Sequence, residues 1–162
     1  MTEECFKAAY KRNSQRLFLI ALSFTKSKSE AEDILQNVFL KLWKSEKSFS
    51  DDEHIDKWLT VVCVNESKNL IKSFFKRSVV PLNEADGQLA FERENDYELF
   101  SAVMSLSKKE RTVVHLFYYE ELSVREISSL LKISESAVKT RLSRARKNIK
   151  FALGDEQEDE QN

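Results

Sequence analysis

Residues 123–147, SVREISSLLKISESAVKTRLSRARK, decide the fold of the C-terminal part of this 162-residue chain. Ser123 and Glu126 have the spacing of a capping box, in which the hydroxyl accepts from the first-turn backbone and the carboxylate accepts from the cap N–H. A helix is therefore predicted to begin near Val124, and its apolar residues recur at intervals of three and four as far as Leu131. The pattern lapses at residues 132–134, which indicates a tight turn.

A second helix is predicted after this turn, with its apolar and polar residues on opposite sides. The apolar positions fall within a narrow arc of a helical wheel: Val138, Leu142, Ala145 and Ile149. The opposite side and its edges carry hydroxyls and cations: Ser136, Lys139, Thr140, Arg141, Ser143, Arg144, Arg146, Lys147 and Lys150. Two short helices joined by a tight turn, the second rich in cations, are typical of a helix-turn-helix, which indicates DNA binding.

The second helix of a helix-turn-helix lies in the major groove, with its N-terminal residues nearest the base edges. The predicted base-reading residues are therefore Lys139, Thr140, Ser143 and Arg144. The predicted backbone contacts are Arg141, Arg146 and Lys147, with Ser136 as a further hydroxyl of the DNA-binding set. An ordinary solvated amphipathic helix is the alternative, but the capping box, the turn and the one-sided cations agree on the first interpretation. Lys132 stands where such turns often carry Gly.

The distribution of charge supports this interpretation, although the formal net charge is only −1. Residues 107–150 carry 11 Lys and Arg against 5 Asp and Glu, a net of +6, and residues 1–77 carry 14 against 11, a net of +3. Residues 78–106 carry 1 against 6, and residues 151–162 carry 0 against 5, so each has a net of −5. Phosphate contacts depend on this local distribution of charge and not on the total.

Composition predicts an almost entirely α-helical protein, because only 2 Gly and 1 Pro occur in the chain. No apolar run approaches a membrane span, and the start, MTEECFK, lacks the pattern of a signal peptide, so we expect a cytoplasmic protein. Cys5 and Cys63 are expected to be plain thiols. His54 and His115 have neither metal-ligand spacing nor a neighbouring nucleophile, and there is no phosphate-binding Gly-rich loop. We expect no catalytic residue, metal or cofactor.

Two helical domains are predicted. The N-terminal domain, residues 1–77, holds helices at about 4–25, 31–45 and 55–75, the second opened by a capping box at Ser29 and Glu32 and the third preceded by a polar break, KSFSDDEH. Residues 78–95 are predicted to be an acidic linker. The C-terminal domain, residues 96–152, contains a further capping box at Ser107 and Glu110, which predicts a helix that continues through Tyr118. Residues 153–162 are expected to form an acidic tail.

Several stretches together resemble the small two-domain sigma factors of bacterial RNA polymerase, the extracytoplasmic-function (ECF) type. In the N-terminal half they are AEDILQNVFLKLW at 31–43, SF at 48–49, WL at 58–59 and VCVNESKNL at 62–70. In the C-terminal half the resemblance is carried by LSKKERTVVHLFYYEELSVREISSLLKISESAVKTRLSRAR at 106–146. The chain departs from the family's usual pattern at Asn37, at residues 63–65 and at residues 136–138.

The resemblance implies roles for matching residues. The residues that match the helix docking on the polymerase clamp are Asp33, Gln36, Asn37, Phe39, Leu40 and Trp43. Those that match the surface capturing unpaired bases of the minus-ten promoter element are Phe49, Trp58, Asn65 and Asn69. The minus-thirty-five reading helix is matched by Lys139, Thr140, Ser143 and Arg144.

Physical arguments from the residues support the minus-ten assignment. Aromatic rings stack on unpaired bases and Asn amides bond to base edges, while Lys68 and Lys72 continue the same helix as a cationic strip for phosphates. Taken alone, Trp58 is more typical of a core residue, whereas Phe49 fits either role.

The resemblance further implies an alternative sigma factor with three partners: core RNA polymerase, through its clamp region and flap, promoter DNA and an anti-sigma factor. No small-molecule substrate is expected. The alternative is a stand-alone helix-turn-helix regulator with an N-terminal sensing or dimerisation module, which would form a dimer on a palindromic site. A further hypothesis is that the acidic linker and tail fold over the basic reading module in the free protein.

Overall fold

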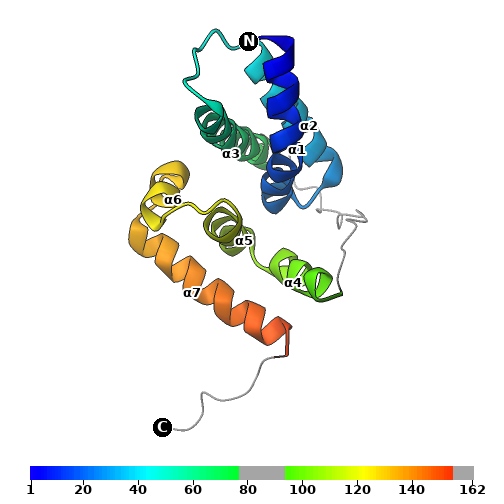
Figure 1. Ribbon diagram of the computed structural model, residues 1–162. Coiled ribbons are helices and arrows are strands. Elements are labelled where there is room, and N and C mark those ends of the chain that lie inside the picture. The colour runs from blue at the N-terminus through cyan, green and yellow to red at the C-terminus, as the bar shows by residue number, and fades with distance from the viewer. Residues whose placement is uncertain (77–93, 155–162) are drawn as a thin grey trace. The chain divides into compact units, whose positions relative to one another are not determined.

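The computed structural model describes residues 1–76 and 94–154, and the chain divides into two compact units, Met1–Gly87 and Gln88–Asn162 (Figure 1). The described residues form helices joined by short loops, with no strand among them, so the predicted all-α fold class is confirmed. The predicted linker at 78–95 lies almost wholly outside the described residues, as does most of the predicted acidic tail.

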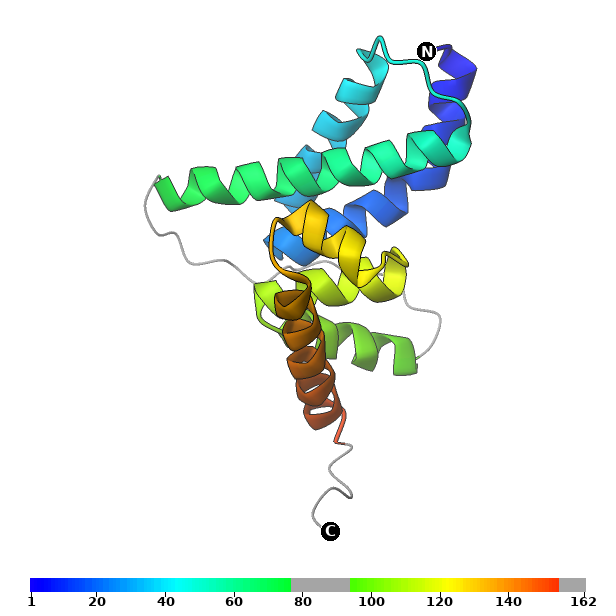
Figure 2. The same ribbon diagram turned by 90° about the vertical axis from the view of Figure 1, so that its left-hand side faces the viewer.

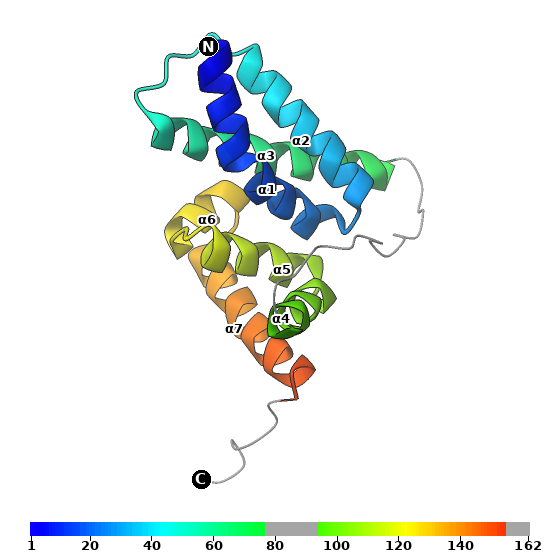
Figure 3. The same cartoon turned by 45° about the vertical axis from the view of Figure 1, so that its right-hand side comes forward.

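The N-terminal unit consists of α1 (Glu3–Thr25), α2 (Lys28–Trp43) and α3 (Asp52–Lys76). Helices α1 and α2 pack side by side, and α3 crosses both of them (Figures 2 and 3). The core between the three helices is made of fully buried aliphatic side chains, among them Leu17, Ile20, Val38, Leu42, Leu59 and Val64. Each of these side chains comes from the apolar stripe of its helix, and burial of those stripes holds the unit together.

The start of α2 differs from the sequence prediction. Ser27, and not Ser29, is the N-cap, and its Oγ accepts a hydrogen bond of 3.4 Å from the Glu30 backbone N–H. The capping box predicted at Ser29 and Glu32 is therefore wrong. The reason lies in the preceding residue: Lys26 adopts the left-handed conformation, with φ of 54°, which ends α1 and leaves Ser27 extended and ready to cap the next helix.

Helix α3 begins three residues earlier than predicted, at Asp52 instead of Ile55. Its first turn is held by Asp51, whose Oδ1 accepts a hydrogen bond of 2.7 Å from the His54 backbone N–H. This bond, more than any other contact, holds the pKa of Asp51 below its ordinary value. The acidic run that looked like a polar break is thus the capped start of a helix.

The C-terminal unit consists of α4 (Glu94–Ser105), α5 (Lys108–Val114), η1 (His115–Tyr119), α6 (Val124–Leu131) and α7 (Glu135–Ala152). The predicted capping boxes at Ser107 with Glu110 and at Ser123 with Glu126 are both confirmed. Segment η1 is one turn of π-helix, in which the Glu120 N–H bonds to the His115 carbonyl at 3.2 Å. The sequence had predicted an uninterrupted helix through Tyr118.

Arg111 fastens α5 to the end of α4. Its side chain is 2% exposed, and Nη1 donates to the Leu106 carbonyl at 2.8 Å and to the Met104 carbonyl at 3.5 Å. The Arg111 guanidinium thus satisfies carbonyls at the C-terminal end of α4, which would otherwise need water or another capping group. Burial lowers the pKa of Arg111 to about 10.

Candidate nucleic-acid and polymerase interfaces

Helix α6 leads through a tight turn into α7 (Figure 2), and this turn is built by local hydrogen bonds. Lys132 ends α6 in the left-handed conformation, with φ of 56° and ψ of 49°. The Ile133 N–H donates to the Ser128 carbonyl at 3.1 Å, and Ser128 Oγ donates to the Ile133 carbonyl at 2.6 Å. Ser134 then caps α7 by accepting from the Ala137 N–H at 3.0 Å. The predicted helix-turn-helix is therefore present, with Lys where Gly is common.

Helix α7 presents the predicted DNA-binding residues to the surface. Val138, Leu142 and Ala145 are buried against the rest of the unit, which leaves the opposite side of the helix open. The exposed members of the set are Ser136, Lys139, Thr140, Ser143, Arg144, Arg146 and Lys147, and Arg141 is half-buried. An exposed helical face of hydroxyls and cations has the form and charge needed to enter a major groove.

A second cluster forms where the loop between α2 and α3 meets the first turns of α3, and two aromatic residues of the predicted minus-ten surface meet there. The rings of Phe49 and Trp58 lie edge to face with centroids 5.5 Å apart, and Phe49 also contacts His54 at 5.3 Å. Lys47 Nζ lies 5.7 Å from the centre of the Trp58 ring. Phe49 and Trp58 are both half-buried, so each packs against the protein on one side and keeps part of its ring exposed.

The remaining minus-ten candidates lie along α3. Asn65, Asn69 and Lys72 are exposed, and Lys68 is half-buried. Their spacings of three, four and seven residues place them on one face of the helix, one below the other, and Trp58 shares that face seven residues before Asn65. The structure thus brings together a partly exposed aromatic pair, two amides and two cations on one side of the N-terminal unit.

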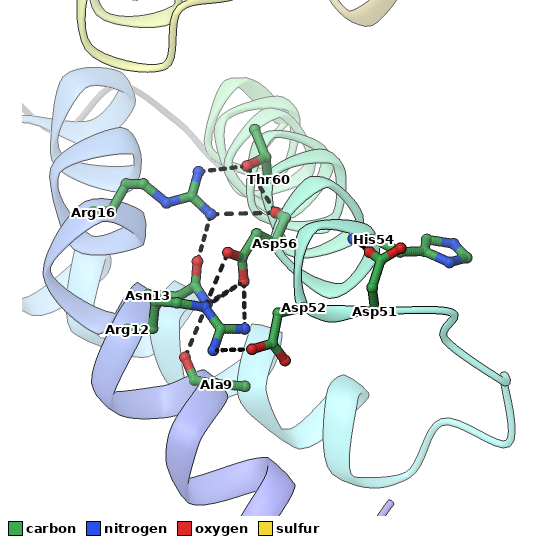
Figure 4. A network of polar contacts seen from close by, with 9 residues as sticks. All are labelled: Ala9, Arg12, Asn13, Arg16, Asp51, Asp52, His54, Asp56 and Thr60. Carbon is green, nitrogen blue, oxygen red and sulfur yellow. Dashed lines mark hydrogen bonds and ion pairs between the residues drawn. The ribbon is translucent and has the colours of Figure 1, made fainter.

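The opposite side of α3 is fastened to α1 by a polar network that the sequence analysis did not find (Figure 4). Arg12 forms a two-pronged contact with Asp56, Nε to Oδ2 at 3.0 Å and Nη2 to Oδ1 at 2.9 Å, and reaches Asp52 at 3.1 Å. Asn13 Nδ2 donates to Asp56 at 2.7 Å, and Arg16 Nη1 donates to Thr60 Oγ1 at 2.7 Å.

This network lowers the pKa of the Asp56 carboxyl group. Partial burial raises the pKa of Asp56, but the hydrogen bonds from Arg12 and Asn13 outweigh burial and hold the pKa below its ordinary value. The hydrogen bond to Asp56 likewise raises the pKa of Arg12. The network joins residues 40 to 44 positions apart in the chain, so no local spacing reveals it. Its position behind the predicted base-capturing face gives it the role of holding α3 in place.

The predicted polymerase-contacting residues of α2 divide into two groups. Asp33, Gln36, Asn37, Leu40 and Trp43 are exposed, with Leu40 and Trp43 each about half accessible to solvent. Phe39 differs from the prediction, because it is only 4% exposed and packs against Tyr10 at 4.7 Å and Phe6 at 6.0 Å between ring centroids. Phe39 therefore acts as packing under this surface and has little area to offer a partner.

An aromatic groove lies between α1 and α2, beside the exposed stripe of α2 that is formed by Asp33, Gln36, Asn37, Leu40 and Trp43. Its apolar walls and floor are Phe6, Tyr10, Leu35, Phe39, Leu40 and Trp43, and charged or polar groups at its rim are Glu3, Lys7, Glu32 and Gln36. Trp43 meets Phe6 edge to face at 5.2 Å. Phe6 and Tyr10 of α1 were not predicted to be part of this surface, because their place in the groove depends on how α1 packs against α2.

Among the residues that the structure describes, no helix is long and apolar enough to cross a membrane. Within the same part of the chain, no three His, Cys, Asp or Glu side chains gather in a way that would hold a metal ion.

Two family models match the chain, one in each of its two units. Residues 9–74 match Sigma-70 region 2, and residues 97–149 match Sigma-70, region 4. The chain is therefore of the class whose helical units act in promoter recognition by bacterial RNA polymerase. Among curated relatives, the ECF RNA polymerase sigma factor SigW of Bacillus subtilis strain 168 is 30% identical over 143 residues, covering 78% of this chain and 76% of SigW. This chain belongs to the ECF RNA polymerase sigma factors.

Other relatives agree with this assignment. SigM of Bacillus subtilis strain 168, also an ECF sigma factor, is 28% identical, with 87% of this chain and 90% of SigM covered. The probable RNA polymerase sigma factor RfaY of Xanthomonas campestris is 25% identical over 83% of this chain, but the match spans only 36% of RfaY.

Solved structures share the fold. The sigma factor RpoE from Bartonella quintana, in complex with the anti-sigma factor NepR, has a TM-score of 0.75 and 20% identity, covering 94% of this chain and 98% of RpoE. CnrH, in complex with the cytosolic domain of CnrY, has a TM-score of 0.60 and 22% identity, covering 96% of this chain and 92% of CnrH.

Proposed function

We propose that this ECF sigma factor binds bacterial core RNA polymerase and directs transcription initiation from its own set of promoters. The observation that carries the proposal is the exposed cationic face of α7 in the same chain as the aromatic, amide and cationic face of α3. One face suits duplex recognition and the other suits unpaired bases, and promoter opening requires both. A stand-alone regulator, the alternative considered from the sequence, would not account for matches to both sigma-70 regions.

Helix α7 serves as the reader of the minus-thirty-five element. Lys139 and Arg144 donate to guanine edges, whereas Thr140 and Ser143 bond to base edges or phosphates. The cations on the edges of the helix, including Arg141 and Lys147, add salt-dependent affinity without sequence preference.

The exposed face of α3 serves as the binding surface for the minus-ten element. The exposed parts of Phe49 and Trp58 stack on bases that have left the duplex, and Asn65 and Asn69 bond to their edges. Lys68 and Lys72 lie along the same face and neutralise neighbouring phosphates. The Arg12–Asp56 network, on the opposite side of α3, supports this binding surface by fixing α3 on α1.

The exposed stripe of α2 serves as the docking face for the polymerase. Asp33, Gln36 and Asn37 supply the polar contacts, and Leu40 with Trp43 supplies the apolar ones. Because Gln36 and Leu40 also line the aromatic groove, the docking face continues without a break onto Tyr10 of α1. An apolar side chain of the polymerase seated in the groove would bury the exposed parts of Tyr10 and Trp43.

An anti-sigma factor is the third proposed partner. Among the structural neighbours, the sigma factor RpoE was solved in complex with the anti-sigma factor NepR, and CnrH was solved in complex with the cytosolic domain of CnrY. The exposed apolar residues of α2 would suit an inhibitory partner as well as polymerase. In this proposal the chain works in the cytoplasm as an initiation factor, and catalysis stays with the polymerase.

The domain limits predicted from the sequence stay part of the proposal. Residues 1–77 bind the polymerase and the minus-ten element, and residues 96–152 read the minus-thirty-five element. Residues 78–95 are the connection between them, and residues 153–162 are the acidic tail.

Transcription in vitro tests the proposal. Core polymerase, purified from the bacterium that encodes the chain, would be mixed with fragmented genomic DNA of that bacterium, and the 5′ ends of the transcripts sequenced with and without the chain. We expect a new set of start sites that share two sequence elements. If the chain binds the polymerase and no start site changes, the proposed function is wrong.

Two variants assign the result to the two surfaces. Leu40→Asp places a charge in the apolar docking face, and we expect it to abolish both polymerase binding and the new start sites. Arg144→Ala removes a base-reading cation, and we expect it to retain polymerase binding while losing most of the new start sites. Glu53→Gln, at an exposed position of α3 away from both surfaces, is the matched control.

A further inference from the structure

The side chain of Arg146 on α7 is held by contacts with other described residues of the C-terminal unit. Its Nε donates a hydrogen bond of 2.6 Å to Tyr118 Oη. Its guanidinium carbon also lies 5.7 Å from the centre of the Tyr118 ring and 5.9 Å from that of Phe117. A directed hydrogen bond combined with contact to two π faces holds a guanidinium more firmly than either would alone.

The two aromatic residues belong to η1, the π-helical turn that the sequence analysis did not anticipate. Their rings lie edge to face, with centroids 5.0 Å apart and an interplanar angle of 79°. A π turn adds one residue to the helical repeat and so turns the side chains that follow it to a new direction. The turn thus places a hydroxyl and two ring faces within reach of α7.

A second polar contact fastens the same half of α7 on its other side. Asn148 Nδ2 donates to Glu110 Oε1 at 3.3 Å, and Glu110 is itself held because its Oε2 accepts from Ser107 Oγ at 2.8 Å. On a helical wheel Arg146 and Asn148 lie about 80° to either side of the buried stripe that includes Ala145. Rotation of α7 about its own axis would stretch one of these contacts whichever way it turned.

We infer that Arg146 is a positioning residue of the reading helix and not a phosphate contact, and that Arg146 on Tyr118, together with Asn148 on Glu110, sets the rotation of α7 in the major groove. This inference rests on the proposed function, because it concerns how α7 reads promoter DNA. It changes the role predicted for Arg146 from the sequence, where the charge alone suggested a contact with the DNA backbone.

The two roles differ in a measurable quantity. The salt slope is the steepness with which log affinity falls as log salt concentration rises. A cation that neutralises a phosphate releases a counterion, so its loss lowers this steepness by about 0.9. A cation that acts through the orientation of α7 leaves that slope unchanged. Its loss instead weakens the discrimination between DNA sequences, because base contacts need the helix in one rotation.

The first experiment measures the salt slope with the full chain on a labelled duplex of mixed sequence, by fluorescence anisotropy. Lys147→Gln is the phosphate-contact control and is expected to lower the slope by about 0.9. Arg146→Gln and Tyr118→Phe are both expected to leave it unchanged. If Arg146→Gln lowers the slope as much as Lys147→Gln while Tyr118→Phe changes nothing, the inference is overturned.

The second experiment selects sequences with the reconstituted holoenzyme from a promoter library randomised in the upstream element. We expect Tyr118→Phe, Arg146→Gln and Arg146→Lys each to reduce the preference for the selected sequence by about fivefold, the worth of one hydrogen bond. The double variant Tyr118→Phe with Arg146→Gln should lose no more than either single variant. Wild-type preference in Arg146→Lys, which keeps the charge but not the Nε contact, would contradict the inference.

These outcomes separate the inference from the function on which it rests. A wild-type chain that shows no salt-dependent binding and selects no sequence with polymerase would refute the proposed function itself. Tyr118→Phe removes a single hydroxyl from a half-exposed ring, so its folding can be checked by circular dichroism before either measurement.

Discussion

At the scale of single residues, Asp56 is the carboxylate on which the Arg12 and Asn13 donors converge, behind the proposed base-capturing face of α3. It accepts from both Arg12 and Asn13, and its pKa is held below the ordinary value by these bonds in spite of partial burial. A carboxylate whose folded pKa is lowered stabilises the protein above its unfolded pKa, near 3.9, and loses that contribution as the pH falls through the folded value. The stabilising contribution of Asp56 should therefore be fully present at neutral pH and be lost as the pH falls below about 4.

Asp56→Asn should lower the free energy of unfolding of the N-terminal unit by about 2 kcal/mol at pH 7, because it removes charge-assisted hydrogen bonds from a partly buried site. The difference from wild type should shrink below about pH 4, where Asp56 itself becomes protonated. Both tryptophans of the chain, Trp43 and Trp58, lie in this unit, so urea unfolding followed by their fluorescence reports on it. Glu53→Gln, at an exposed pair with Lys57, should change the value by less than about 0.5 kcal/mol. Equal effects of the two substitutions would contradict the proposed role of Asp56.

The start of α2 provides a second comparison between residues. Ser27→Ala should destabilise the N-terminal unit by about 1 kcal/mol, because it removes the Oγ that accepts from the Glu30 N–H. Ser29→Ala, two residues into the helix, should be neutral or slightly stabilising because Ala has the better helix propensity. Thermal and urea unfolding of both variants measure the difference, and the reverse order would restore the capping box predicted from the sequence.

At the scale of elements, the turn between α6 and α7 is set by Lys132, a non-glycine residue in the left-handed conformation. A side chain there costs about 1 kcal/mol relative to Gly. Lys132→Gly should therefore stabilise the C-terminal unit by up to about 1 kcal/mol. Lys139→Gly, in the second turn of α7, should destabilise the C-terminal unit by about 1 kcal/mol and serves as the control.

Hydrogen exchange of the buried amides in α6 and α7 measures both changes in the C-terminal unit, which has no tryptophan. Lys132→Gly is thus expected to raise the protection of these amides, and Lys139→Gly is expected to lower it. Lower protection in Lys132→Gly would contradict this prediction, because the Lys132 side chain would then stabilise the turn by more than its left-handed conformation costs.

At the scale of the whole molecule, the unequal distribution of charge is the dominant feature. Residues 107–150 have a net charge of +6, and residues 151–162 have a net charge of −5 in the same chain. The free protein should therefore bind DNA less tightly than its basic surface suggests, because a nearby acidic segment competes with phosphate for the same cations.

Deleting residues 155–162 should raise the affinity of the free chain for duplex DNA by about threefold at 20 mM salt, and the gain should vanish above about 300 mM. Fluorescence anisotropy over this salt range measures both effects. Replacing the five acidic residues of that segment with Gln and Asn is the control that keeps the length of the chain. An unchanged affinity at low salt in both variants would argue against electrostatic competition by the tail.

Local chemistry was sufficient to predict much of this protein. The helix-turn-helix, two of the three capping boxes and the outward face of α7 follow from spacings of three and four residues, which are fixed by the geometry of one helix. Where two serines had suitable spacing, at Ser27 and Ser29, the sequence pattern selected the wrong one. The choice depended on the backbone of Lys26, which the pattern does not encode.

The sequence by itself determined the all-α fold class, the helix-turn-helix and the cationic outward side of α7, because helix periodicity, capping and charge are properties of neighbouring residues. Only the tertiary structure decided that Phe39 is packing while Leu40 is surface, that Arg12 holds Asp56, and that Arg146 is occupied by Tyr118. The last two pairs are 44 and 28 residues apart, and the first distinction depends on how α1 lies against α2. Such contacts arise from the packing of whole helices, and packing is decided by the fold as a whole.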